Sequence, residues 1–77
     1  MKELKILLGT IEDVKEFVNI TNKYEFDCDL ISGRYAVDAK SIMGIFSLDL
    51  SKPIDLHIHS EEDVEQILSV LAPYIVE

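Results

Sequence analysis

The sequence predicts an α+β fold in which helices cover one face of a sheet. Three segments alternate apolar and polar residues with a period of two, the pattern of strands with one buried face. Two other segments repeat apolar residues at intervals of three and four, which is typical of amphipathic helices. Single-faced strands bury one side against helices and leave the other side to water. The predicted order of elements is β-α-β-β-α-β-α.

The first strand and the first helix meet at a capping signal. Residues 4–8 alternate in the strand pattern, and Gly9 ends it. Thr10 stands at the N-cap position, with Asp13 three residues later as a variant of the capping box. The residues that follow predict a helix with one buried stripe, formed by Val14, Phe17, Val18 and Thr21.

A hairpin is predicted next. Phe26, Cys28 and Leu30 alternate with polar neighbours and form its first strand. A turn follows at 32–34, and 35–37 return as a short third strand. Cys28 is in phase with the apolar residues of its strand, so we expect a small buried residue and not a reactive thiol.

The apolar segment 42–48 fits a helix or a strand by periodicity alone. Lys40-Ser41 as a cap favours a short helix, and Pro53 is expected to stop it. We expect Ile42 and Met43 to be exposed on this helix, and Ile45, Phe46 and Leu48 to lie mostly inside. A two-turn helix cannot bury all of its apolar faces.

The clearest strand pattern, 54–59, precedes the last helix. Ser60 is predicted to cap that helix, with Asp63 at the capping-box position and Glu61-Glu62 at its positive end. Its buried stripe is expected to contain Val64, Ile67, Leu68, Leu71 and Ile75. Pro73 is expected to kink or fray the final turn.

Composition excludes several classes of function. The 77 residues fit one small domain, 1–77, and the net charge of −8 argues against nucleic-acid binding and against docking on an anionic membrane. A single cysteine forms no internal disulfide, and no signal peptide or membrane span is recognisable. The expectation is a soluble cytoplasmic protein without a cofactor. No catalytic set and no Gly-rich phosphate loop appears, so no enzyme is predicted.

The segment from Lys40 to Leu48, KSIMGIFSL, resembles the surroundings of the regulatory serine in the HPr family. This family contains the histidine-containing phosphocarriers of the bacterial sugar phosphotransferase system. Residues 22–30, NKYEFDCDL, resemble the family's first helix end and second strand, and the order of elements agrees. The resemblance implies an open-faced β-sandwich, with three helices on one face of a four-stranded antiparallel sheet.

The phosphoacceptor histidine of that family has no counterpart here. Phosphate-carrying members have a histidine at the start of the first helix, in a Gly-x-His-Ala-Arg-Pro context, whereas residues 9–14 read GTIEDV. Thr10 stands closest to the histidine position. A threonine phosphoester is far more inert than a phosphohistidine, and Glu12 and Asp13 would repel a phosphoryl group. We therefore interpret Thr10 as a helix cap.

Ser41 matches the serine that a dedicated kinase phosphorylates in many Gram-positive HPr proteins. Its flanks match as well, with Lys40 before it and Ile42-Met43 after it. The resemblance implies that Ile42 and Met43, beside Lys40, form a surface bound by partner proteins. Ser41 is thus a candidate for regulatory phosphorylation, a role compatible with its being only an N-cap.

The only two histidines, His57 and His59, are expected on the solvent side of the last strand. Two histidines with this spacing form a weak candidate for a metal site, to which Asp27 or Asp29 would add a carboxylate if the second strand is adjacent. Because zinc sites use three or four ligands in a closed geometry, the favoured interpretation is two solvated residues and no metal.

Three hypotheses of function follow. The first is an HPr-like regulatory interaction module without histidine phosphotransfer, gated at Ser41, with partners in the phosphotransferase and catabolite-control system that include an HPr kinase. The second is a phosphocarrier with a non-standard acceptor. The third is a small-molecule-binding regulatory domain of another family, such as an ACT-like domain.

Overall fold

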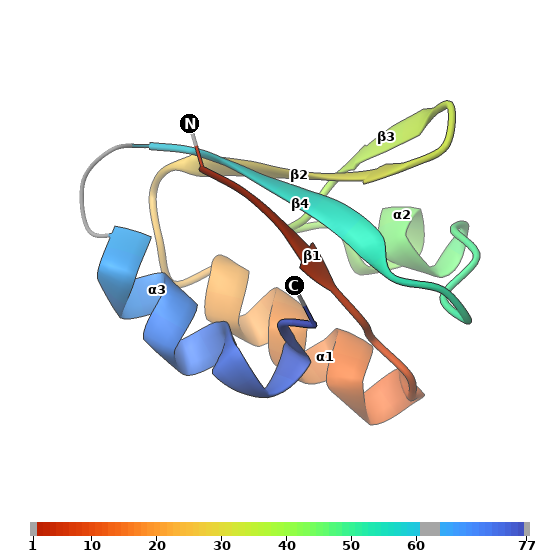
Figure 1. Ribbon diagram of the computed structural model, residues 1–77, viewed down its shortest axis with the longest axis horizontal. Helices are drawn as coiled ribbons and strands as arrows, with labels where there is room; N and C mark the ends of the chain where they lie inside the picture. Colours follow the sequence, from red (N-terminus) through yellow and green to blue (C-terminus); the bar gives the residue numbers. More distant parts are fainter. Residues whose placement is uncertain (1, 61–63, 77) are drawn as a thin grey trace.

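The chain alternates strands and helices in the predicted order, in a computed structural model that describes residues 2–60 and 64–76 (Figure 1). The elements are β1 (Lys2–Ile6), α1 (Ile11–Thr21), β2 (Asp27–Ser32), β3 (Tyr35–Asp38), α2 (Ile42–Phe46), β4 (Ile54–His59), α3 (Val64–Leu71) and a 3-10 turn, η1 (Ala72–Tyr74).

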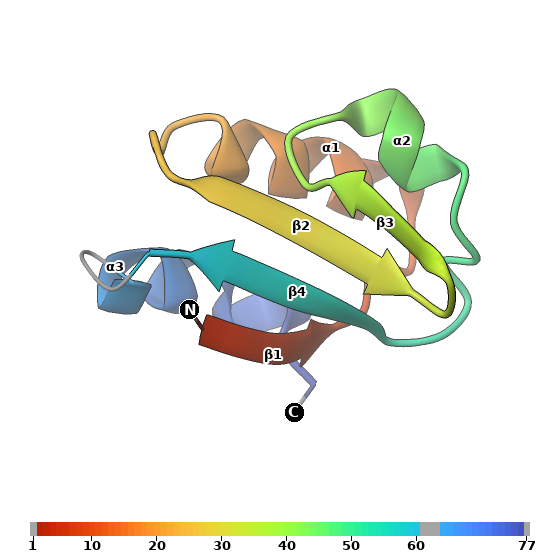
Figure 2. The same ribbon diagram turned by 90° about the horizontal axis from the view of Figure 1, so that it is seen from above.

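The four strands form one antiparallel sheet in the order β1-β4-β2-β3. Pairing of Leu4 with Leu56, Leu56 with Leu30, and Leu30 with Val37 places these four residues in one row across the sheet. The helices lie on the face to which this row belongs, and the other face is uncovered (Figures 1 and 2). The open-faced sandwich is therefore confirmed.

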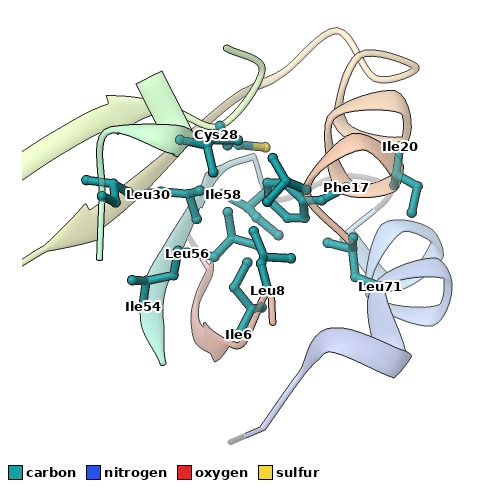
Figure 3. Packing of buried hydrophobic residues seen from close by; sticks show 14 of the residues in the cluster. Ile6, Leu8, Phe17, Ile20, Cys28, Leu30, Ile54, Leu56, Ile58 and Leu71 are labelled. Atoms are coloured by element: carbon teal, nitrogen blue, oxygen red, sulfur yellow. The ribbon is translucent and has the colours of Figure 1, made fainter. Parts of the chain in front are cut away.

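The core lies between the sheet and the helices (Figure 3). Its central side chains are fully buried and come from β1, β2, β4, α1 and α3, among them Ile6, Phe17, Cys28, Leu30, Leu56, Ile58 and Leu71. Strands β2 and β4 bury alternate residues because successive side chains point to opposite faces. This alternation leaves the intervening polar residues on the uncovered face.

The first two elements differ from the sequence prediction at single positions. β1 ends at Ile6, and Leu8 is buried although it lies beyond the strand. The buried stripe of α1 contains Ile20, which the prediction omitted, while Val18 is only partly buried. The helical period allows both residues at the edge of the stripe, and packing against the neighbouring elements decides between them.

The short helix α2 is confirmed, but two details were wrong. It ends at Phe46, well before Pro53, and its C-cap is Ser47. Ile45 and Leu48 are buried as expected, whereas Phe46 is 41% exposed. A helix of five residues buries only the side that faces the sheet, and Ile45 occupies that side. Phe46, the next residue, is rotated by about 100° around the helix and so remains partly exposed.

The last helix ends as Pro73 predicts. α3 stops at Leu71, and the chain continues as η1 with Pro73 in it. Ile75 does not belong to the helix stripe; it forms a β-bridge with Ile6 instead. The predicted cap partner Asp63 and Glu61-Glu62 lie outside the described residues. Over the described ranges, no helix is long and apolar enough to cross a membrane.

Candidate functional site

Thr10 is the N-cap of α1. Its backbone is extended, and its hydroxyl oxygen accepts a hydrogen bond of 3.0 Å from the backbone N–H of Asp13. Glu12 and Asp13 occupy the first turn, where the helix dipole favours negative charge. Lys15 lies 3.8 Å from the Glu12 carboxylate. The positive end of α1 therefore already carries two carboxylates.

Both histidines lie on β4, on the uncovered face of the sheet. The Nε2 atom of His59 is 2.6 Å from Asp29 Oδ2 on the neighbouring strand β2. The Nε2 atom of His57 is 3.8 Å from Glu3 Oε1 on β1. Asp29 pairs with His57 in the register, so its contact with His59 is diagonal.

Strands β2 and β4 are adjacent, which meets the condition for Asp27 or Asp29 to join the histidines, yet this adjacency gathers no set of metal ligands. Across residues 2–60 and 64–76, no three His, Cys, Asp or Glu side chains are grouped so as to hold a metal ion. His57 and His59 each face a carboxylate on a different strand, Glu3 on β1 and Asp29 on β2. Two separate pairs do not make the closed geometry of a zinc site.

Ser41 caps α2. Its hydroxyl oxygen accepts a hydrogen bond of 3.2 Å from the backbone N–H of Gly44. A Cβ atom at Gly44 would lie 3.3 Å from Ser41 Oγ and 3.3 Å from Val37 Cβ on β3. Gly44 thus allows α2 to approach β3 closely while the serine cap stays in place.

A set of hydrogen bonds fixes the segment before α2, and sequence reasoning did not find it. The single hydroxyl hydrogen of the buried Thr21 is shared between the carbonyls of Ala39 and Val18, each 3.1 Å from its oxygen. The Asn22 side chain donates to the carbonyl of Lys40, and the Lys40 ammonium donates to the carbonyl of Tyr24 at 2.7 Å. The sequence did contain one signal for these bonds: Thr21 is a polar residue in the otherwise apolar stripe of α1, and a buried hydroxyl needs a hydrogen-bond partner.

These bonds give Lys40 a structural contact, in addition to the partner-binding role expected for it. They join the end of α1 to the residues that precede Ser41. The position of α2 on the sheet is therefore set by bonds from α1 as well as by the packing of Ile45.

The exposed apolar side chains of α2 are Met43, 76% exposed, and Phe46. Ile42 is partly buried and packs against the core. Ile42 and Met43 were both expected to be exposed, but only Met43 is. The exposed apolar surface of α2 therefore consists of Met43 and Phe46. Methionine and phenylalanine at such a position suit contact with another protein.

Cys28 is fully buried on β2, as predicted. Burial raises the pKa of its thiol to about 11. The thiolate is the reactive form of cysteine, so this residue belongs to the core and not to a reactive site.

Comparison with known families gives a match that covers most of the chain. The family model described as "PTS HPr component phosphorylation site" matches residues 13–76. The match begins three residues after Thr10. It favours the HPr resemblance over a small-molecule-binding domain of another family. No curated protein matches the chain in sequence.

Two solved structures are similar over nearly their whole length. The crystal structure of HPr-C-His from Thermoanaerobacter tengcongensis has 28% sequence identity and a TM-score of 0.78, with 95% of this chain and 89% of that chain covered. The phosphocarrier protein HPr from Bacillus anthracis str. Ames has 25% identity and a TM-score of 0.72, with 97% and 96% covered.

Proposed function

This chain belongs to the HPr family, and on that basis we propose that it is a protein–protein interaction and regulatory module of the bacterial phosphotransferase system that does not carry phosphate on a histidine. One observation carries the proposal. The only two histidines of the sequence lie on β4, on the uncovered face of the sheet, and none lies at the start of α1.

The electrostatics at the start of α1 support the same proposal. A phosphoryl group that approaches Thr10 meets the carboxylates of Glu12 and Asp13 in the first helical turn. The Thr10 oxygen already accepts the N–H of Asp13, which is one of the free amides that an incoming anion would use. The residues here form a cap and lack the features of a phosphate acceptor.

The docking surface that we propose is α2. Met43 and Phe46 are exposed there, with Ile42 beside them at the edge of the core. Ser41 begins the same helix, so a phosphate on its hydroxyl would add a charge of about −1.5 to −2 next to the apolar side chains. Phosphorylation of Ser41 would thereby select between partners without unfolding the domain.

The direct test is incubation with phosphoenolpyruvate and the first enzyme of the phosphotransferase system, followed by intact mass measurement under alkaline conditions. The expected result is no acid-labile phosphate on the protein. A histidine-containing HPr in the same reaction is the positive control. An acid-labile adduct on this chain would refute the absence of histidine phosphotransfer.

A phosphocarrier with a non-standard acceptor is the second candidate. The observation in its favour is His59, which is 40% exposed in its side chain and lies 2.6 Å from Asp29. A carboxylate that orients an imidazole increases its ability to act as a nucleophile. If the adduct forms, His59→Gln should abolish it and His57→Gln should not.

The remaining parts of the proposal follow from the family and the composition. We place the protein in the cytoplasm, as a single domain spanning 1–77 that acts through contacts and not as an enzyme. Its proposed partners are proteins of the phosphotransferase and catabolite-control system, including an HPr kinase.

A further inference from the structure

The uncovered face of the sheet has a composition unlike that of a merely solvated surface. Alternation with the buried residues places Glu3 and Lys5 of β1 on this face, with Asp55, His57 and His59 of β4 and Asp27 and Asp29 of β2. Asp38 of β3 pairs with Asp29 and shares the face. Figure 2 shows this face turned toward the viewer, with α1 and α3 behind it.

Charge on this face is strongly one-sided. Among the described strand residues it contains the carboxylates of Glu3, Asp27, Asp29, Asp38 and Asp55. Lys5 is the one lysine among those strand residues on the face, and its ammonium lies 3.0 Å from Asp55. About half of the net charge of −8 is therefore displayed on one side of the sheet.

The face is also hollowed between its first two strands. A shallow depression of about 370 Å³ is lined by Glu3, Leu4, Lys5, Asp55 and His57. Its acidic groups remain accessible, since the side chains of Glu3 and Asp55 are 59% and 45% exposed. The Leu4 side chain points to the helix-covered face, so on the uncovered face the depression is bordered by the side chains of Glu3, Lys5, Asp55 and His57. A long side chain with a cationic end matches these accessible carboxylates.

We propose that the uncovered face of the sheet docks an Arg/Lys-rich segment of a partner protein. Guanidinium groups pair with carboxylates in a bidentate geometry, and the strands present carboxylates on three neighbouring strands, at Glu3, Asp55 and Asp29. A second copy of this chain would bring like charges together, and so would nucleic acid or an anionic membrane. The face is separate from α2, so this docking does not depend on the function proposed above.

The test uses the full-length protein and an oligo-arginine peptide as the probe, with a backbone amide NMR titration and calorimetry. The variant removes three carboxylates from the face: Glu3→Gln, Asp27→Asn and Asp29→Asn. The matched control removes three exposed carboxylates elsewhere: Glu16→Gln, Glu25→Gln and Glu65→Gln. Both triple variants have the same net charge, which separates the face from the overall charge of the chain.

We expect peptide-induced shifts to be confined to β1, β4 and β2 in the wild type and in the control variant. The face variant should bind about tenfold more weakly, because each exposed charge pair contributes about 0.2–1 kcal/mol. Equal weakening in both variants, or shifts spread over the helices, would overturn the proposal. It would also be overturned if Mg²⁺ alone shifts the same amides stoichiometrically and prevents peptide binding, since the face would then be a cation site.

Discussion

The Lys40 ammonium donates a hydrogen bond of 2.7 Å to the backbone carbonyl of Tyr24, 16 residues earlier in the chain. This bond connects the loop after α1 to the residue that precedes Ser41. Tyr24 itself stacks on Phe26, with ring centroids 5.3 Å apart. The proposed regulatory serine therefore stands next to a residue that is tied to the α1–β2 loop.

Removal of this bond should destabilise the fold. Lys40→Ala leaves the Tyr24 carbonyl without its charged donor, and a hydrogen bond to a charged group contributes about 1.5–3 kcal/mol. We expect a loss near the lower limit, because the contact is only partly buried, and a fall in Tm of several degrees. Thermal unfolding of Lys40→Ala is compared with that of Lys23→Ala, which removes an exposed lysine just beyond the C-cap of α1. Equal Tm values for the two variants would show that the bond from Lys40 to Tyr24 does not contribute to the free energy of unfolding.

The cap of α1 predicts a second stability effect. Thr10→Ala removes the oxygen that accepts the Asp13 N–H and should reduce the free energy of unfolding by about 1 kcal/mol. Thr10→Ser keeps an acceptor oxygen and should cost much less. Urea denaturation measures both values. Because the cap is local, the amide NMR signals of β2 and β3 should be the same in Thr10→Ala and in the wild type. Changes spread over these strands would contradict a purely local cap.

Modification of Ser41 should change partner binding without unfolding the protein. Incubation with the HPr kinase of a Gram-positive bacterium should add one phosphate to the wild type and none to Ser41→Ala. Phosphate oxygens can accept the Gly44 N–H that Ser41 Oγ now accepts, so the melting curve should be unchanged.

The matching interaction experiment uses Ser41→Asp and Met43→Ala. Both should alter binding to a phosphotransferase-system partner, Ser41→Asp through charge and Met43→Ala through loss of an exposed apolar contact. Met43→Ala should change the free energy of unfolding by no more than about 0.5 kcal/mol. If the kinase does not accept Ser41 and Ser41→Asp leaves all binding unchanged, the serine is only a helix cap.

Cys28 predicts a pH dependence of stability on the alkaline side. Its thiol has a pKa of about 11 in the folded protein, against 9.0 for the unperturbed group, because burial disfavours the thiolate. The raised pKa means that the unfolded chain loses its proton first. The associated stability is therefore complete below about pH 9 and is lost as the pH rises toward 11.

The measurement is the slope of the unfolding free energy between pH 8 and pH 10.5. Cys28→Ala should have a shallower slope than the wild type, although its absolute stability is lower because a cavity remains. The comparison uses the slopes of the unfolding free energy against pH, because the cavity in Cys28→Ala lowers that free energy by the same amount at every pH. Identical slopes would show that the thiol does not titrate differently in the two states.

Much of this fold follows from local patterns. Alternation assigned β2 and β4 and their buried faces, and the side-chain caps at Thr10 and Ser41 were predicted from residues within four positions of each other. Such features depend on neighbours along the chain, so a single sequence contains the information. The HPr resemblance added the antiparallel arrangement of the four strands.

Other features depended on contacts between distant segments. The bond from Lys40 to Tyr24, the diagonal pair of His59 and Asp29, and the exposure of Phe46 each require the relative placement of separate elements. Periodicity gives the face on which a side chain lies but not the atom that it meets there. The sequence by itself thus determined the elements, their buried faces and the absence of a histidine at the start of α1. Only the tertiary structure decided that Lys40 is bonded within the fold and that the acidic side chains of three neighbouring strands form one surface, because sheet order brings together residues that the chain keeps far apart.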